Sequence, residues 1–180
     1  EIQYHAYPNR GSPPLAPVVE RVPLLAMDAH GWRYRETAGG LSSDWAAQSH
    51  PVDHRTWFEG QGPLGFSVAL ADQLNTGLGF PTLNNPPFIT YYFETEFEFS
   101  GTENPFELVM NHLVDDGAVF YLNGIEVHRV NLPEANVSGE TTAVAEVRNA
   151  ERSANVEIPA ASLLRGTNRV SVEVHQIDIG

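Results

Sequence analysis

The clearest pattern of apolar and polar residues in this chain covers residues 89–100. One side holds Tyr91, Phe93, Thr95, Phe97 and Phe99. The other side holds Tyr92, Glu94, Glu96 and Glu98. This period of two predicts a strand with one buried and one solvated face. Shorter alternating segments predict strands over 24–36, 106–113, 155–159 and 169–175, with a further short strand near 142–147.

Residues 117–130 hold the strongest local signal. Two alternating segments are joined by Asn123 and Gly124. A two-residue hairpin turn of this kind needs positive φ at both positions, which asparagine and glycine tolerate. The segment is therefore predicted to be a β-hairpin, and the chain to contain antiparallel strands.

The chain shows no apolar stripe of helical period and normal helix length; only residues 160–164 predict a short helical turn, closed by Gly166. Many short strands with frequent turns indicate an all-β protein, an antiparallel β-sandwich of jelly-roll type. Five of the 13 prolines lie in residues 1–23. Since proline lacks the N–H that a sheet needs, 1–23 is predicted to be an extended arm or linker, and 24–180 the sandwich domain.

Charge and composition exclude several functions. The net charge is −13, which repels nucleic-acid phosphates and anionic membranes. No run of 18 apolar residues predicts a membrane span. There is no cysteine and no lysine, which excludes disulfides, thiolate sites and Schiff-base chemistry. No signal peptide is visible at the start, so a chain that begins at Glu1 is expected to be a processed product or an excised piece.

Two motifs carry a family resemblance. The hairpin of residues 115–131 reads DDGAVFYLNGIEVHRVN, and the strand of 163–176 reads LLRGTNRVSVEVHQ. Together they resemble the jelly-roll, galactose-binding-like (carbohydrate-binding-module-like) accessory domains of secreted bacterial proteins. Weaker matches are the segments 32–34, 44–45, 53–57, 60–66 and 90–97.

The resemblance implies a jelly-roll fold, and it implies little about the ligand. The chain departs from the family pattern in two places. Glu94 stands where the family has arginine, and the family continues past His175-Gln176 into a final strand, whereas this chain stops at Gly180. The sheet edge left there is closed by a very short strand, by the 1–23 arm or by another chain.

Candidate sugar ligands come from loop aromatics and amides. Aromatic rings stack on the C–H faces of sugars, and amides or carboxylates bind the hydroxyl groups. These residue types predict a ligand site made by Trp57, Asp53, Asn84, Asn85 and Tyr92. The alternative is that the tryptophans fill the core, which the resemblance favours for Trp32 and Trp45.

Asp115 and Asp116 have two interpretations. In one, their carboxylates accept hydrogen bonds from backbone N–H groups at the entry to the hairpin. In the other, they bind Ca²⁺, a hard ion that prefers oxygen ligands. Calcium, where bound, is then expected to be structural.

These observations predict a non-catalytic carbohydrate-binding or adhesion module of a larger secreted or cell-surface protein, with a polysaccharide or glycan as partner. The alternative is a self-assembling structural subunit that shares strands or edges with neighbouring copies or domains. No nucleophile elbow, phosphate loop or dinucleotide fingerprint is present, so an enzyme is not predicted.

Overall fold

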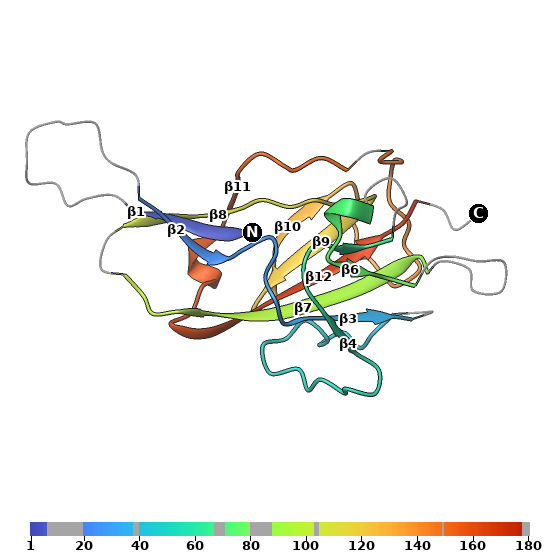
Figure 1. The fold of residues 1–180 in the computed structure, drawn as a ribbon, viewed down its shortest axis with the longest axis horizontal. Coiled ribbons are helices and arrows are strands. Elements are labelled where there is room, and N and C mark those ends of the chain that lie inside the picture. Colours follow the sequence, from blue (N-terminus) through green and yellow to red (C-terminus); the bar gives the residue numbers. More distant parts are fainter. Residues whose placement is uncertain are drawn as a thin grey trace, which may run out of the picture.

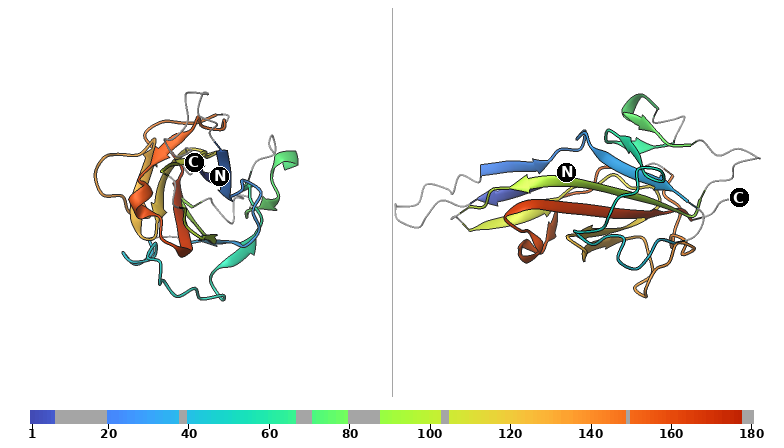
Figure 2. Two further views of the ribbon diagram at one scale, coloured as in Figure 1. Left: turned by 90° about the vertical axis from the view of Figure 1, so that its left-hand side faces the viewer. Right: turned by 90° about the horizontal axis from the view of Figure 1, so that it is seen from below.

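The computed structural model describes residues 1–6, 20–37, 40–66, 71–79, 88–102, 105–148 and 150–177. Their regular structure is almost entirely β, in two antiparallel sheets that enclose a shared core (Figures 1 and 2). The predicted all-β antiparallel sandwich is therefore confirmed. No helix in the described segments is both long and apolar enough to cross a membrane.

The larger sheet has six strands in the order β10-β9-β12-β7-β3-β4. Its centre is formed by the ten-residue strands β7 (Thr90–Phe99) and β12 (Gly166–His175), which pair along their full length. The other strands are β3 (Trp32–Glu36), β4 (Phe58–Gly60), β9 (Gly117–Leu122) and β10 (Ile125–Val130).

The smaller sheet has four strands in the order β11-β8-β1-β2. They are β1 (Ile2–Ala6), β2 (Glu20–Leu25), β8 (Phe106–Met110) and β11 (Val156–Ile158). β1 lies between β8 and β2, so Ile2–Ala6 form an inner strand of this sheet where an extended arm or linker was predicted. The prolines did not exclude strands there, because residues 2–6 contain none and Pro23 lies on the edge strand β2.

The smaller elements complete the sandwich. β5 (Leu64–Gly65) and β6 (Thr76–Gly77) form a short parallel pair, and the 3₁₀ turn η1 covers Ala71–Gln73. The helical turn predicted near 160–164 is present as the 3₁₀ turn η2 (Ala160–Ser162). No strand forms over 142–147; instead, the backbone N–H of Ala143 donates to the carbonyl of Gln176.

The core lies between the two sheets. The smaller sheet contributes Ile2, Leu25, Leu108, Met110 and Ile158. Inward-facing residues of the larger sheet complete it: Tyr91, Phe93, Phe97, Ala118, Phe120, Leu122, Val170 and Val172. Burial of these side chains is the main favourable contribution to folding, at about 1.5–3 kcal/mol for each large side chain.

The outer face of β7 is only partly solvated, contrary to the prediction from its alternation. Glu96 and Glu98 are exposed, whereas Tyr92 and Glu94 are fully buried. The segment 41–57 covers this end of the strand and forms a second apolar cluster of Trp45, Ala46 and Trp57 on Tyr92. Two layers of β-structure thus carry a third, irregular layer on one side.

An arginine holds this segment on the sheet. Arg169 of β12 donates to Glu96 at 2.8 Å and to the carbonyl of His50 at 2.8 Å. The buried carboxylate of Glu94 lies between Arg33 at 2.8 Å and Arg169 at 3.6 Å. Because a buried carboxylate needs opposite charge nearby, the two arginines accommodate Glu94 in the interior.

The predicted hairpin is confirmed, with its turn at Asn123 (φ 53°) and Gly124 (φ 83°). The turn also touches the 41–57 segment, because a Cβ on Gly124 would lie 3.2 Å from the Cα of Ala47. The side chain of Asn123 accepts from the N–H of Arg169 and donates to the carbonyl of Ser162. The hairpin tip therefore fixes neighbouring segments as well as reversing the chain.

We predict that Gly124→Ala lowers the free energy of unfolding by about 1–2 kcal/mol, because a left-handed backbone carrying a Cβ is strained and this Cβ meets Ala47. Urea denaturation followed by circular dichroism measures the change. The matched control is Gly77→Ala, where an added Cβ meets nothing within 4 Å. Equal effects of the two substitutions on stability would contradict this steric role of Gly124.

Candidate functional site

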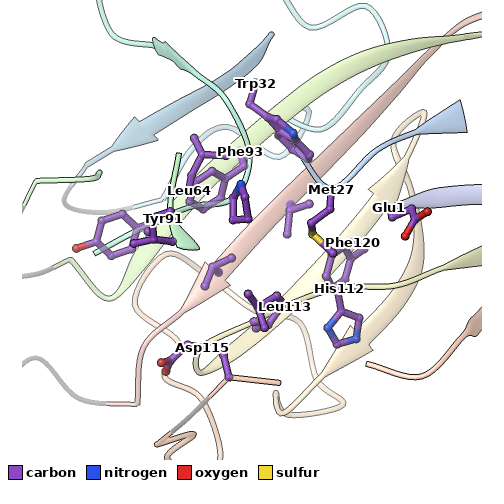
Figure 3. A pocket seen from close by; sticks show the side chains of 18 of the residues that line it. Glu1, Met27, Trp32, Leu64, Tyr91, Phe93, His112, Leu113, Asp115 and Phe120 are labelled. Atoms are coloured by element: carbon purple, nitrogen blue, oxygen red, sulfur yellow. The ribbon is translucent and has the colours of Figure 1, made fainter. Parts of the chain in front are cut away.

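An apolar cavity of about 250 Å³ lies between the two sheets (Figure 3). Trp32 of β3, Tyr91 and Phe93 of β7, and Phe120 of β9 line it from the larger sheet. The smaller sheet and adjoining segments supply the opposite wall: Ile2, Leu25, Met27, Leu64, Met110 and Leu113. A concave apolar site with a few polar groups at its margin is the usual form of a small-molecule binding site.

A close backbone approach shapes one wall of the cavity. The N–H of Gly62 donates to the carbonyl of Ala29 at 3.0 Å, and a Cβ on Gly62 would lie only 2.4 Å from the carbonyl oxygen of Met27. Glycine is therefore required at this position. The contact brings the 62–66 segment, with Leu64 and Phe66, against the inner face of the larger sheet.

His112 belongs to the margin of the cavity. Its ring lies 5.2 Å from the ring of Phe120 and 5.3 Å from that of His128, measured between centroids. Burial, with a smaller effect from His128, lowers the pKa of His112 to about 4. The imidazole is therefore neutral at physiological pH and extends the apolar wall.

Asp115 also belongs to the margin, and its side chain is open to solvent. Figure 3 places it at the side of the cavity opposite Trp32. Partial burial, followed by a hydrogen bond with Asp116 and the charges of Asp116 and Glu146, raises the pKa of Asp115 to about 6. A carboxyl group next to an apolar cavity is therefore partly protonated near neutral pH.

Asp116 has a structural role at the entry to the hairpin. Its carboxylate oxygens accept hydrogen bonds from the backbone N–H groups of Val147 at 2.7 Å and Ile177 at 2.8 Å. The first of the two interpretations of this aspartate therefore has direct geometric support. Within the described residues, no group of three histidine, aspartate or glutamate side chains is arranged to hold a metal ion, and calcium binding stays a prediction.

The described members of the predicted sugar site are not gathered on one open surface. Trp57 is 4% exposed and Tyr92 is 1% exposed, and both belong to the second apolar cluster with Trp45. Tyr92 packs edge-on against Trp45, with ring centroids 4.9 Å apart, so neither ring of this pair offers a free face. Trp45 and Trp57 are therefore buried in an apolar cluster, as in the alternative in which the tryptophans fill the core.

The remaining predicted ligands are polar. Asp53 is exposed, and its carboxylate accepts from the N–H of Arg55, which closes a turn before Trp57. Asn84 and Asn85 lie outside the described residues. None of the described sugar-ligand candidates, Asp53, Trp57 and Tyr92, lines the cavity between the sheets.

A buried polar network accounts for the histidine of the last strand. The Tyr121 hydroxyl donates to Glu173 at 2.6 Å, and Glu173 lies 3.5 Å from the ring of His175. His175 is itself hydrogen-bonded to Thr90 and to the carbonyl of Thr141. Because every member has a partner in the fold, this network is structural.

Sequence reasoning did not identify the cavity. Alternation correctly assigns the aromatic residues of its wall to the buried face of strands, but alternation does not reveal where a space remains between two packed sheets.

No protein-family model, curated protein or solved structure matches the chain.

We predict that Asp116→Ala lowers the free energy of unfolding by about 2 kcal/mol, because two backbone N–H groups lose a charged acceptor. Thermal and urea denaturation measure the loss. Asp115→Ala, at the exposed neighbouring position, serves as the control and is expected to change stability much less. A transition midpoint that rises with Ca²⁺ in the unmodified chain but not in Asp116→Ala would instead favour the calcium interpretation.

Proposed function

We propose that this chain is a binding module that holds a small, largely apolar ligand between its two sheets and does not transform it. The observation that carries this proposal is the cavity of about 250 Å³ lined by aromatic and aliphatic side chains. A secreted or cell-surface location, as the family resemblance implies, is part of the same proposal.

The size of the cavity limits the ligand. An apolar cavity of about 150 Å³ in another protein holds benzene. The larger space here suits a ligand of about two fused rings with a short substituent. Rings of Trp32, Tyr91 and Phe120 around the cavity favour an aromatic or alicyclic body over a fully hydroxylated sugar, whose polar groups would lose hydration there.

The groups at the margin favour binding over catalysis. His112, with its pKa lowered to about 4, is a weak base at neutral pH. The carboxylate of Asp116 is engaged by two backbone N–H groups. These properties of His112 and Asp116 support a function in which the protein binds its ligand on a preformed apolar surface.

Binding of 2-(1-naphthyl)ethanol, measured by isothermal titration calorimetry, tests the proposal. We expect binding to the unmodified chain and at least a tenfold weaker affinity in Leu74→Trp, because the larger side chain fills the cavity that Leu74 lines. The matched control is Leu164→Trp, since Leu164 is 43% exposed and does not line the cavity. Absence of binding, or equal binding by all three proteins, would contradict the proposal.

A second candidate function is carbohydrate binding or adhesion, as the galactose-binding-like resemblance implies. The observation that favours it is Phe58 on the edge strand β4, which is 54% exposed and lies 5.6 Å from the ring of Tyr34. Glu36 follows Tyr34 by two residues on the same strand, and its charge acts on the Tyr34 hydroxyl. An open ring beside hydroxyl and carboxylate groups is the combination that sugars require.

We predict that Phe58→Ala abolishes retention of the chain by immobilised polysaccharides in affinity electrophoresis, because the stacking face is removed. Ile125→Ala is the matched control, since Ile125 is equally exposed at 54% on the other edge strand of the same sheet. Running each gel with and without EDTA separates calcium-dependent retention. Equal retention of the two variants would argue against a sugar site at Phe58.

A further inference from the structure

We propose that the cavity between the sheets selects a ligand with a cationic head group, an arylalkyl- or alkylammonium ion, which pairs with Asp115 at the mouth. This inference rests on the proposed function and specifies its ligand class. It follows from which cationic or N–H groups pair with each carboxylate around the cavity.

Three of the four nearby carboxylates already have a cationic or backbone N–H partner. The carboxylate of Glu146 pairs with Arg148 at 3.2 Å. The carboxylate of Glu1 forms a salt bridge with Arg152. That of Asp116 accepts two backbone N–H groups. Within the described part of the chain, no salt bridge reaches Asp115, and no arginine lines the cavity. Among these carboxyl groups, Asp115 is hydrogen-bonded only to another carboxyl group, that of Asp116, and so lacks a cationic partner among the described residues.

The surrounding charge favours a cation as well. Asp116 and Glu146 both act on Asp115, and each increases the negative potential at the mouth. His112, the titratable ring at this margin, is neutral at physiological pH. The chain as a whole carries a net charge of −13. An ammonium group is attracted to this position, and a carboxylate group is repelled.

The position of Asp115 matches an amphipathic ligand. The apolar body contacts Trp32, Phe93 and Phe120 inside the cavity, and the charged head stays at the margin. Because Asp115 is exposed on one side, the head group keeps part of its hydration when it pairs with the carboxylate. An ammonium ion placed deeper would lose that hydration against apolar walls.

Three probes of one shape test the inference by titration calorimetry at 50 mM salt: 2-(1-naphthyl)ethylammonium, 2-(1-naphthyl)ethanol and 1-naphthylacetate. We expect the ammonium to bind about three- to fivefold more tightly than the alcohol, as an exposed charge pair allows, and the carboxylate to bind most weakly. In Asp115→Asn the affinity ratio of ammonium to alcohol falls to about one. Glu59→Gln, which removes one exposed negative charge outside the cavity, keeps the ratio.

The ratio also depends on salt. In the unmodified chain, raising the salt to 500 mM reduces the ratio, which tests the charge pair without any substitution.

The outcomes separate the two proposals. Equal binding of alcohol and ammonium by the unmodified chain overturns the cationic preference and leaves the apolar binding function standing. A preference that survives in Asp115→Asn or at high salt overturns the role of Asp115. Failure of all three probes to bind overturns the binding function itself.

Discussion

The pairing of β1 with β8 and β2 is the interaction on which the rest of the sandwich depends. This strand, from residues 2–6, connects the two halves of the smaller sheet, so that Ile2, Leu25 and Met110 face the larger sheet together. The smaller sheet has four strands, and the larger sheet that it packs against has six. The cavity lies between the two sheets, with Ile2, Leu25 and Met110 in its lining. The first residues of the chain thus determine the shape of the candidate site.

Polar groups fix the segments that no strand holds. Arg169 ties the 41–57 segment to the outer face of the larger sheet through the carbonyl of His50, and Asp116 ties two segments far apart in sequence through their backbone N–H groups. Each of these charged side chains is buried and hydrogen-bonded. Removing one partner would leave a buried polar group unsatisfied, which is more costly than the bond itself is favourable. The segments that Arg169 and Asp116 bind therefore have defined positions without regular secondary structure.

The two candidate surfaces differ in chemistry because they face different environments. The cavity between the sheets has apolar walls and, at its margin, the carboxyl group of Asp115 without a cationic partner among the described residues, which suits an amphipathic ligand. The edge strand β4 presents a single half-exposed ring at Phe58, beside Tyr34. The aromatic residues expected from the sequence to bind sugar, Trp57 and Tyr92, instead belong to one buried cluster with Trp45. The aromatic residues of the 41–57 segment therefore indicate that this segment packs on the sheet, since burial of their large surfaces stabilises that packing.

Local patterns determined much of this protein by themselves. Alternation fixed the strands β7, β8 and β12, and Asn123-Gly124 fixed the hairpin, because side-chain period and positive φ are properties of neighbouring residues. Tertiary structure decided the remainder: that β1 is an inner strand, that the 41–57 segment packs on Tyr92, and that an apolar cavity lies between the sheets. These features depend on which distant segments meet. An alternating sequence predicts that a strand has two different faces. Which of these faces meets water depends on the segments that pack against the strand.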